Sequence, residues 1–293
     1  MLDRLRYYGR YATGFAASRI PGPLIYGVAP TDRCNLACRE CHVSNSGRPD
    51  MSWERLIATL TDARRRGFRE LYFTGGEPML WSDGERTLDH AVDAARELGY
   101  FHVHVYTNGT LGLLSNADLM WVSMDGLPET YALRRGDHFA HVEAAVRDTH
   151  RPPVALIYTV DRFTESGIEE FLAWVRDSRL PVTGVMFYFH TPYYGRDELF
   201  LDAGERAVVI DRLIACARAR EPMLNSIAGL RALKSGRWPR RLPCAAVADI
   251  DGESVCCRAS DAVCAECGYS ACAEIWESMR LRPSAMLAMG RYL

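Results

Sequence analysis

The chain has 293 residues, of which 48% are hydrophobic and 25% are charged, and its formal net charge is -2. This composition provides a hydrophobic core of ordinary size without disulfides or partner chains. The charge balance gives no field that would attract nucleic acid or an anionic membrane. No apolar run approaches the roughly 18 residues of a membrane span, and no apolar block of a signal peptide opens the chain. We therefore expect a cytoplasmic protein with no transmembrane span and no nucleic-acid partner.

The cysteines fall into two groups. Of the ten in the chain, three lie between Cys34 and Cys41 and six between Cys244 and Cys272. In a reducing compartment such groups indicate metal or redox chemistry rather than disulfides. The remaining one, Cys216, stands in an apolar stretch and is expected to pack as a small hydrophobic side chain.

Taken in chain order, the pattern opens with a basic extension, residues 1–23, that we expect to form a helix closing the bottom of a barrel. Strand-like and amphipathic helix-like stretches then alternate as far as about residue 220, which is typical of a parallel sheet. The expected strands are Leu24–Ala29, Glu70–Thr74, His102–Tyr106, Leu119–Met124, Val154–Val160 and Val182–Phe189. The expected helices are Ser52–Arg65, Thr87–Leu98, His138–Asp148, Gly167–Asp177 and Gly204–Arg220.

This alternation predicts an α/β fold whose core, residues 24–220, is a partial (β/α)6 TIM-like barrel. Residues 221–243 lose the periodic pattern and are expected to form a bridging segment. A small cysteine-rich module, residues 244–293, follows, with a hairpin at Asp251-Gly252 and a final helix over Ala271–Leu281. In parallel sheets ligands bind at the carboxyl ends of the strands, so the loops that follow strands are the candidate sites.

The first cysteine group follows the first expected strand with the spacing C-x3-C-x2-C, at Cys34, Cys38 and Cys41. Three thiolates leave one iron of a cubane without a protein ligand. A zinc site is the alternative, although structural zinc sites close with four ligands, usually as two C-x2-C pairs. The segment Thr31–Cys41 resembles the cluster loop of the radical S-adenosylmethionine (SAM) superfamily. That resemblance implies a 4Fe-4S cluster whose free iron binds SAM.

The end of the second strand is similar to the GGEP motif of the same superfamily. The motif residues are Gly75, Gly76, Glu77 and Pro78. The glycines expose backbone carbonyls and the glutamate adds negative charge, and an ammonium group needs acceptors of that kind. The resemblance implies that this turn binds the amino group of SAM, whereas a plain tight turn is the alternative.

Two later strand ends also resemble superfamily motifs. Asn108 stands in a TNG sequence, and Ser123 and Asp125 stand in an SxDG sequence that an Arg-Gly pair, starting at Arg135, follows. The resemblance implies that Ser123 and Arg135 hold the SAM carboxylate, because a guanidinium suits bidentate pairing. It also implies that Asn108 and Asp125 support the site near the ribose.

The chain departs from the family pattern at two places. Glu40 precedes the third cysteine, where the family usually has an aromatic residue near the adenine. The expected fifth strand, Val154–Val160, lacks the glycine-rich family signature. The resemblance therefore supports SAM binding but leaves the adenine contact open.

The second cysteine group resembles the SPASM and twitch modules, which carry auxiliary 4Fe-4S clusters. The resemblance is that Gly252 is followed four residues later by a cysteine, as in the entry hairpin of those modules. The full SPASM pattern is not met, so one auxiliary cluster is expected. The expected ligands are Cys244, Cys257, Cys264 and Cys267, with Cys256 and Cys272 in reserve. A zinc ribbon is the alternative, since C-x2-C pairs suit zinc equally well.

The sixth strand ends in aromatic residues and one imidazole, and we expect His190, Tyr193 and Tyr194 to contact the substrate. The resemblance implies an oxidoreductase that reductively cleaves SAM to a 5'-deoxyadenosyl radical, takes a hydrogen from its substrate and receives electrons from a flavodoxin or ferredoxin. With only 33 residues before Cys34, too few for a leader-binding domain, we favour a small metabolite, sugar or lipid over a peptide. Maturation of a ribosomally made peptide and a zinc-binding interaction protein are the alternatives.

Overall fold

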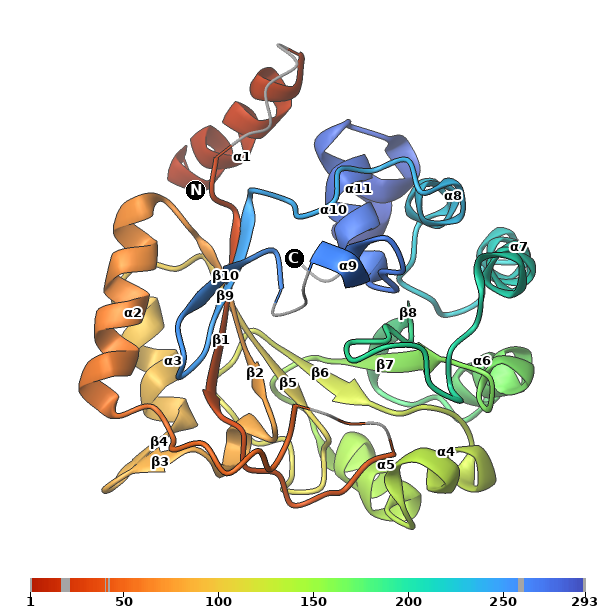
Figure 1. The fold of residues 1–293 in the computed structure, drawn as a ribbon, viewed down its shortest axis with the longest axis horizontal. Helices are drawn as coiled ribbons and strands as arrows, with labels where there is room; N and C mark the ends of the chain where they lie inside the picture. Colours follow the sequence, from red (N-terminus) through yellow and green to blue (C-terminus); the bar gives the residue numbers. More distant parts are fainter. Residues whose placement is uncertain (1, 17–21, 40, 42, 258–260, 292–293) are drawn as a thin grey trace.

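The computed structural model describes residues 2–16, 22–39, 41, 43–257 and 261–291. One curved sheet dominates it, with the strand order β10-β9-β1-β2-β5-β6-β7-β8. Figure 1 shows this sheet as an open curve with helices along its outer side, so the expected partial barrel is confirmed. The strands are β1 (Ile25–Thr31), β2 (Glu70–Gly75), β5 (His102–Thr107), β6 (Leu119–Ser123), β7 (Val154–Val160), β8 (Val182–Phe189), β9 (Ala245–Ala248) and β10 (Glu253–Val255).

The helices that follow the core strands match the periodic stretches of the sequence. They are α2 (Trp53–Arg66), α3 (Leu88–Glu97), α5 (Phe139–Asp148), α6 (Ile168–Asp177) and α7 (Ala203–Arg218). Helix α2 shows why such boundaries can be predicted. The Ser52 side chain accepts a hydrogen bond from the Arg55 N–H (3.3 Å) at its start, and Gly67 ends it with φ 111, in the left-handed region that glycine adopts without strain.

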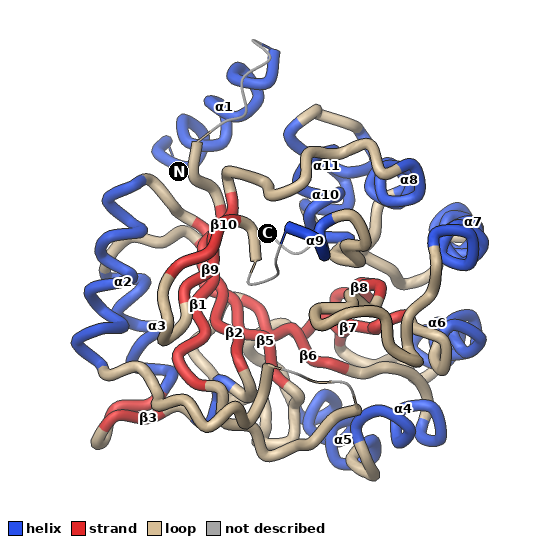
Figure 2. Tube along the Cα trace, viewed as in Figure 1, coloured by secondary structure: helices blue, strands red, loops and turns tan. Residues whose placement is uncertain are grey.

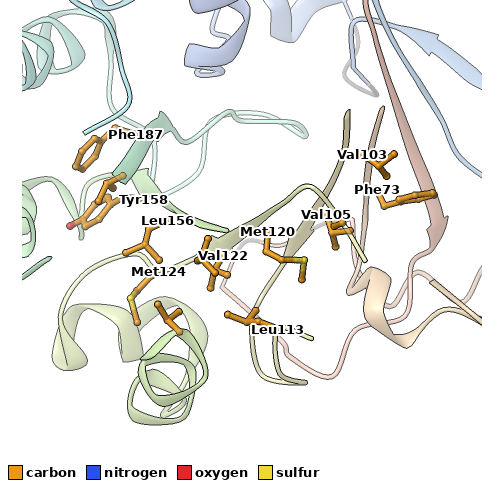
Figure 3. Close-up of a cluster of buried hydrophobic side chains, with 14 of the residues drawn as sticks. Phe73, Val103, Val105, Leu113, Met120, Val122, Met124, Leu156, Tyr158 and Phe187 are labelled. Carbon is orange, nitrogen blue, oxygen red and sulfur yellow. The ribbon is translucent and has the colours of Figure 1, made fainter. Parts of the chain in front are cut away.

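The core lies between the sheet and these helices. Alternate side chains of neighbouring strands point outward, and Figure 3 shows them meeting in one layer, with Val103, Val105, Val122 and Phe187 among those fully buried. The inner face of the sheet is aromatic instead. The Tyr106 ring lies between those of Tyr72 and Trp121, at centroid distances of 5.4 and 5.8 Å. Cys216 is buried in the outer core, as expected of a packing residue.

Among the described residues, three helices longer than six residues were not expected from the sequence. Helix α4 (Pro128–Arg135) lies between β6 and α5, and the segment expected to be a bridge contains helix α8 (Ile227–Ser235). Gly229 weakens the helical pattern of α8, but it is needed there because a Cβ at this position would lie 2.2 Å from the Glu274 Oε1. The expected final helix is confirmed as α10 (Ser270–Met279), but a further helix, α11 (Pro283–Met289), follows it.

Short elements complete the description. The hairpin of β3 (Ser82–Asp83) and β4 (Arg86–Thr87), the single turns η1 (Pro78–Leu80) and η2 (Glu165–Gly167), and the four-residue helix α9 (Asp261–Cys264) lie in connections. No helix in the described ranges has the length and apolar character needed to cross a membrane.

The N-terminal helix α1 (Leu2–Ala16) lies at the end of the sheet where the parallel strands begin. Arg4 Nη2 donates to the Phe101 carbonyl (2.8 Å), next to the start of β5, and the Tyr7 hydroxyl donates to the Pro23 carbonyl (2.8 Å), next to the start of β1. This is the end that we expected the extension to cover. It leaves the opposite end of the sheet for a site.

The C-terminal segment is built onto the core sheet. Strand β9 pairs in parallel with β1, with Ile25 opposite Ala245, and β10 pairs antiparallel with β9. Figure 2 shows the two added strands continuing the sheet beyond β1. The hairpin expected at Asp251-Gly252 is confirmed. The division into a core that ends at residue 220, a bridge and a module that starts at residue 244 stays a prediction, and the sheet runs across its last boundary.

Candidate functional site

The four motif segments lie at one edge of the sheet. The cluster loop follows β1, the GGEP turn follows β2, the TNG turn follows β5 and the SxDG turn follows β6, and these four strands are parallel neighbours. Carboxyl ends of parallel strands meet at the same edge, so segments far apart in the sequence become neighbours here. The expected gathering of these loops is therefore present in the structure.

Asn45 organises the cluster loop. Its backbone is left-handed (φ 54), its N–H donates to the Asp32 carbonyl (2.6 Å) and its Oδ1 accepts from the Cys34 N–H (2.9 Å). Its Nδ2 also donates to the Leu36 carbonyl (3.3 Å). One side chain thus closes the loop that carries Cys34, Cys38 and Cys41. Residues Glu40 and His42 lie outside the described residues.

The glycines of the GGEP turn allow it to touch the cluster loop. A Cβ on Gly75 would lie 2.2 Å from the Thr31 carbonyl oxygen, and one on Gly76 would lie 2.3 Å from the Asp32 carbonyl oxygen. The backbone N–H groups of Gly76 and Glu77 donate to the carbonyls of Thr31 (3.0 Å) and Arg33 (2.7 Å). Any larger side chain would push the two loops apart.

Glu77 is fully buried and joins the GGEP turn to the TNG turn. Its carboxylate accepts hydrogen bonds from the Thr107 hydroxyl (2.8 Å), the Asn108 N–H (2.7 Å) and the Met79 N–H (3.1 Å). Burial raises the pKa of Glu77, and these donors and the Arg135 charge partly offset the effect. Pro78 is buried beside it and starts the single turn η1. The structure thus gives Glu77 a positioning contact, whereas its expected role toward the SAM amine stays a proposal.

Asn108 reaches the cluster loop from the TNG turn. Its Nδ2 lies 2.9 Å from the Asn35 Oδ1 and 3.8 Å from the Cys34 Sγ, and donates to both. Its Oδ1 accepts from the N–H and the hydroxyl of Thr110 (2.9 and 2.7 Å). Asn108 is therefore placed to stabilise a thiolate at Cys34.

Arg135 lies between Asp125 and the second cysteine of the loop. Its Nε donates to the Asp125 Oδ2 (2.6 Å) and its Nη1 lies 3.8 Å from the Cys38 Sγ. Asp125 is fully buried, and its other oxygen accepts from the Thr159 N–H (2.7 Å). The two nearby arginines lower the pKa of Asp125 against the opposing effect of burial, so the pair is ionised. Here Asp125 holds Arg135, which is a different contact from the ribose support expected for it.

The remaining residues at this edge differ in their contacts. Ser123 ends β6, and its hydroxyl has no hydrogen-bond partner among the described residues, which leaves it available to a ligand. The Arg39 N–H donates to the Arg134 carbonyl (2.8 Å) and thereby ties the cluster loop to α4. Burial raises the pKa of Cys34 and of Cys38, so both thiols need a positive or hydrogen-bonding partner to ionise. Cys41 is exposed.

The C-terminal thiols gather differently from the set expected. The Sγ atoms of Cys256 and Cys272 lie 3.7 Å apart, and electrostatic interactions link Cys256 to Cys257 and Cys272 to Cys267. Cys244 instead is buried with its Sγ 4.0 Å from the Met279 Sδ. Cys264 ends α9 and lines an open pocket with Arg240 and Arg241. Throughout the described part of the chain, no three His, Cys, Asp or Glu side chains are arranged to hold a metal ion.

The expected substrate residues lie beside the cluster loop. Tyr193 and Tyr194 line a cavity of about 450 Å³ together with Asp32 and Arg48 and the turn of residues 249–254. His190 is not among the lining residues, and its Nε2 lies 2.8 Å from the Asp197 Oδ2. The Tyr193 hydroxyl pairs with that of Tyr269, beyond Cys267, so the cavity wall reaches the second cysteine group.

Arg48 closes this cavity and was not expected from the sequence. It pairs with the buried Asp32, with Asp249 (3.4 Å) and with Asp251, and so ties the cluster loop to the hairpin of β9 and β10. Neither Arg48 nor Asn45 lies in a sequence pattern. Only the three-dimensional closure of the loops brings their partners together.

Comparisons with known proteins agree with this geometry. The family described as Radical SAM superfamily matches residues 28–191. The chain is 31% identical over 134 residues to a probable GTP 3',8-cyclase of Methanothermobacter marburgensis, covering 41% of each chain. It is 28% identical over 193 residues to the probable GTP 3',8-cyclase of Methanosarcina mazei, covering 58% of this chain and 52% of that one. The chain thus spans about half or less of these curated relatives.

Solved structures share the fold. One is native anSMEcpe with bound AdoMet, at a TM-score of 0.60 and 19% identity, covering 78% of this chain and 72% of that one. Another is Streptococcus suis SuiB bound to precursor peptide SuiA, at a TM-score of 0.58 and 14% identity, covering 76% and 52%. The family match extends over more than half of the 293 residues and contains the cluster loop and the three other motif segments. The chain therefore belongs to the radical SAM superfamily.

Proposed function

We propose that this edge of the sheet binds a 4Fe-4S cluster through Cys34, Cys38 and Cys41, and SAM through the three neighbouring turns. The observation that carries the proposal is that donors already point at the cysteine sulfurs, from Asn108 to Cys34 and from Arg135 to Cys38, each at 3.8 Å. Thiolates bound to iron need such partners, and family membership implies both cofactors. With both bound, the site would supply a 5'-deoxyadenosyl radical that takes a hydrogen atom from the substrate.

The chain's own residues bind and orient SAM. We assign its carboxylate to Arg135 and the free Ser123 hydroxyl, and its amine to the carbonyls of Gly75 and Gly76 beside Glu77. Asp125 fixes the guanidinium plane of Arg135, and Glu77 fixes the turn. Asn108 holds the cluster loop and borders the ribose.

We further propose that the second cysteine group holds an auxiliary 4Fe-4S cluster. The contacts among the thiols favour Cys256, Cys257, Cys267 and Cys272 as ligands. This set keeps Cys257 and Cys267 from the sequence expectation and replaces Cys244 and Cys264. An auxiliary cluster can accept an electron from a substrate radical, which suits the proposed class of oxidoreductase, with a flavodoxin or ferredoxin as reductant.

A small molecule is the favoured substrate. The cavity of about 450 Å³ that Tyr193 and Tyr194 line is within the ordinary range for small ligands and is mostly polar. By their names, two relatives act on GTP and on a hydroxymethylpterin. A peptide is the second candidate, because two of the structural neighbours are described with bound peptides. The residues proposed for substrate contact are Tyr193, Tyr194 and the nearby His190.

The test counts clusters. Protein reconstituted without oxygen is expected to hold close to two 4Fe-4S clusters, and the triple variant Cys34→Ala/Cys38→Ala/Cys41→Ala to hold one. Iron and sulfide analysis with Mössbauer spectroscopy measures both. Zinc bound in place of iron after reconstitution would contradict the proposal and favour the interaction protein.

Single variants test the second ligand set. Cys256→Ala and Cys272→Ala are expected to lose the auxiliary cluster, whereas Cys244→Ala and the core variant Cys216→Ala keep it. If Cys244→Ala loses iron and Cys256→Ala does not, the ligand set expected from the sequence is the better one.

A further inference from the structure

Arg206, on the first turns of α7, is held entirely by backbone carbonyls. Its Nη1 donates to the carbonyls of Glu266 (2.8 Å) and Cys267 (3.5 Å), and its Nη2 donates to the carbonyl of His190 (2.6 Å). The guanidinium also packs on two aromatic rings, 5.8 Å from the Phe189 centroid and 4.9 Å from that of Phe200. One side chain thus joins the end of β8 to the segment that carries Cys267.

No carboxylate among the described residues forms an ion pair with Arg206. The nearest acidic candidate, Glu266, pairs instead with Arg196 (Nε to Oε1 2.7 Å). The Nε of Arg206 is buried and has no hydrogen-bond partner. Among the described residues, Arg206 thus has carbonyl partners but no carboxylate partner of its own.

Arg206 is half-buried, and a partly desolvated charge without a counter-ion is costly, so native proteins usually pair such groups or coordinate them. Carbonyl dipoles satisfy the two Nη atoms but carry no net charge. An anionic group beside Cys267 would supply the missing charge. The cluster proposed above has this property, because four thiolates give a 4Fe-4S cubane a net negative charge.

We propose that Arg206 is the counter-charge of the auxiliary cluster, which raises the reduction potential of that cluster and fixes Cys267 against the end of β8. The inference rests on the proposed auxiliary cluster. Reduction adds one electron to the cluster and no proton, since the guanidinium stays protonated in both states. A fixed positive charge in a desolvated site stabilises the more negative, reduced state.

The segment that carries Cys267 is held directly against the end of β8. The Phe189 N–H donates to the Gly268 carbonyl (2.8 Å), and the Gly268 N–H donates to the Thr191 hydroxyl (2.9 Å). A Cβ on Gly268 would lie 2.0 Å from the Phe189 carbonyl oxygen. Arg206 therefore acts on a cluster held beside the segment that follows β8 and carries His190 and Tyr193. A raised potential at this place favours the transfer of an electron from a substrate radical to the cluster.

The experiment measures the potential of the auxiliary cluster alone. In the full chain with Cys34→Ala/Cys38→Ala/Cys41→Ala, one cluster remains and its midpoint is followed by redox titration with electron paramagnetic resonance. Arg206→Gln is expected to shift the midpoint to a more negative potential, and Arg206→Lys, which keeps the charge, to restore most of the shift. Arg218→Gln removes a charge from the exposed end of the same helix and should leave the midpoint unchanged. Because Arg206 is half-buried, added salt should reduce the shift less than it would for an exposed charge.

Each outcome decides the matter. An unchanged midpoint in Arg206→Gln with full iron content overturns the proposal. If Arg206→Gln fails to assemble the cluster, the Arg206→Lys variant is measured instead. A cluster with the parent midpoint in Arg206→Lys supports the role of the positive charge. Loss of the cluster in both variants shows that Arg206 only holds the structure together, and overturns the proposal. A triple variant that holds no cluster while Arg206 is intact refutes the auxiliary cluster itself, which is a separate result.

Discussion

At the scale of single residues, the site is built from polar side chains that hold one another before any ligand arrives. Glu77 accepts three hydrogen bonds and Asp125 holds Arg135 (2.6 Å), and both carboxylates are fully buried. Such arrangements keep a site close to its working geometry. Of these side chains, Arg135 is the one that can also bind a ligand. Its Nε donates to Asp125 and its Nη1 lies near the Cys38 Sγ, which leaves Nη2 available.

Arg135→Gln is expected to weaken SAM binding tenfold or more, about 1.4 kcal/mol, because the SAM carboxylate loses its cation. The iron content should stay near that of the parent, since the three cysteines are intact and the amide of glutamine can still donate toward the Cys38 Sγ. Equilibrium binding of SAM to the reconstituted protein measures the effect. Arg147→Gln, which breaks an exposed pair on α5, is the control. Unchanged SAM affinity in Arg135→Gln would mean that SAM binds elsewhere.

At the scale of elements, helix α10 places the buried side chain of Glu274 against the start of α8. Glu274 Oε1 accepts from the Ser226 N–H (2.8 Å), at the N-cap of α8, and the side chain is buried. Burial raises the pKa of Glu274 to about 8, with hydrogen bonds from Ser226 opposing the shift. The folded protein therefore holds a proton that the unfolded chain releases at an ordinary carboxyl pKa.

This proton makes stability depend on pH in a defined direction. Between the ordinary carboxyl pKa and about 8 the folded state binds more protons, so stability falls as pH rises through that window. Glu274→Gln keeps the acceptor oxygen without the charge, and is expected to stabilise the protein at pH 9 by on the order of 2 to 4 kcal/mol. At pH 5 the gain should be small. Thermal unfolding across this range measures it, with the exposed Glu97→Gln as the control; equal shifts in both variants would contradict the assignment.

The same elements show what the sequence could predict. The six core strands and the helices with strong periodicity were found, because hydrophobic spacing and caps such as Ser52 and Gly67 are local signals. Helix α8 could not be predicted because Gly229 weakens its helical pattern. The reason for a glycine there is its contact with Glu274, which is distant in the sequence. The four motif segments were placed correctly at one sheet edge. The contacts of Asp125, Asn45 and Arg48 could not be predicted, because they depend on how the loops close in space.

At the scale of the whole molecule, the two cysteine groups lie beside one sheet, since the first follows β1 and the second surrounds β9 and β10. The Phe189 to Gly268 hydrogen bond (2.8 Å) and the pair of Tyr193 and Tyr269 join the end of β8 to the second group. This placement favours a cluster that exchanges electrons with the substrate. A cluster that merely stabilises a thin lobe is the alternative.

Cys256→Ala is expected to separate the two reactions. With a strong reductant the variant should still cleave SAM to 5'-deoxyadenosine, because the first cysteine group is intact, while product formation is lost. Chromatography of both products measures this, with Cys244→Ala as the control. A variant that unfolds supports the stabilising role, and a soluble variant that still forms product contradicts both. The substrate for the assay comes from comparing metabolites of strains with and without the gene.

The pairing of β9 with β1 also determines when the fold can be completed during synthesis. Ile25 emerges from the ribosome first, and its partner Ala245 follows only 220 residues later. Until then β1 has an unpaired edge, which is a template for association with other chains. The loop that carries Cys34 begins directly after this strand. Arg48 joins this loop to Asp251, which is also synthesised late. A nascent chain that stalls before residue 245 is therefore expected to expose an unpaired strand edge beside an incomplete cysteine loop, and to associate with other chains more readily than the folded protein does.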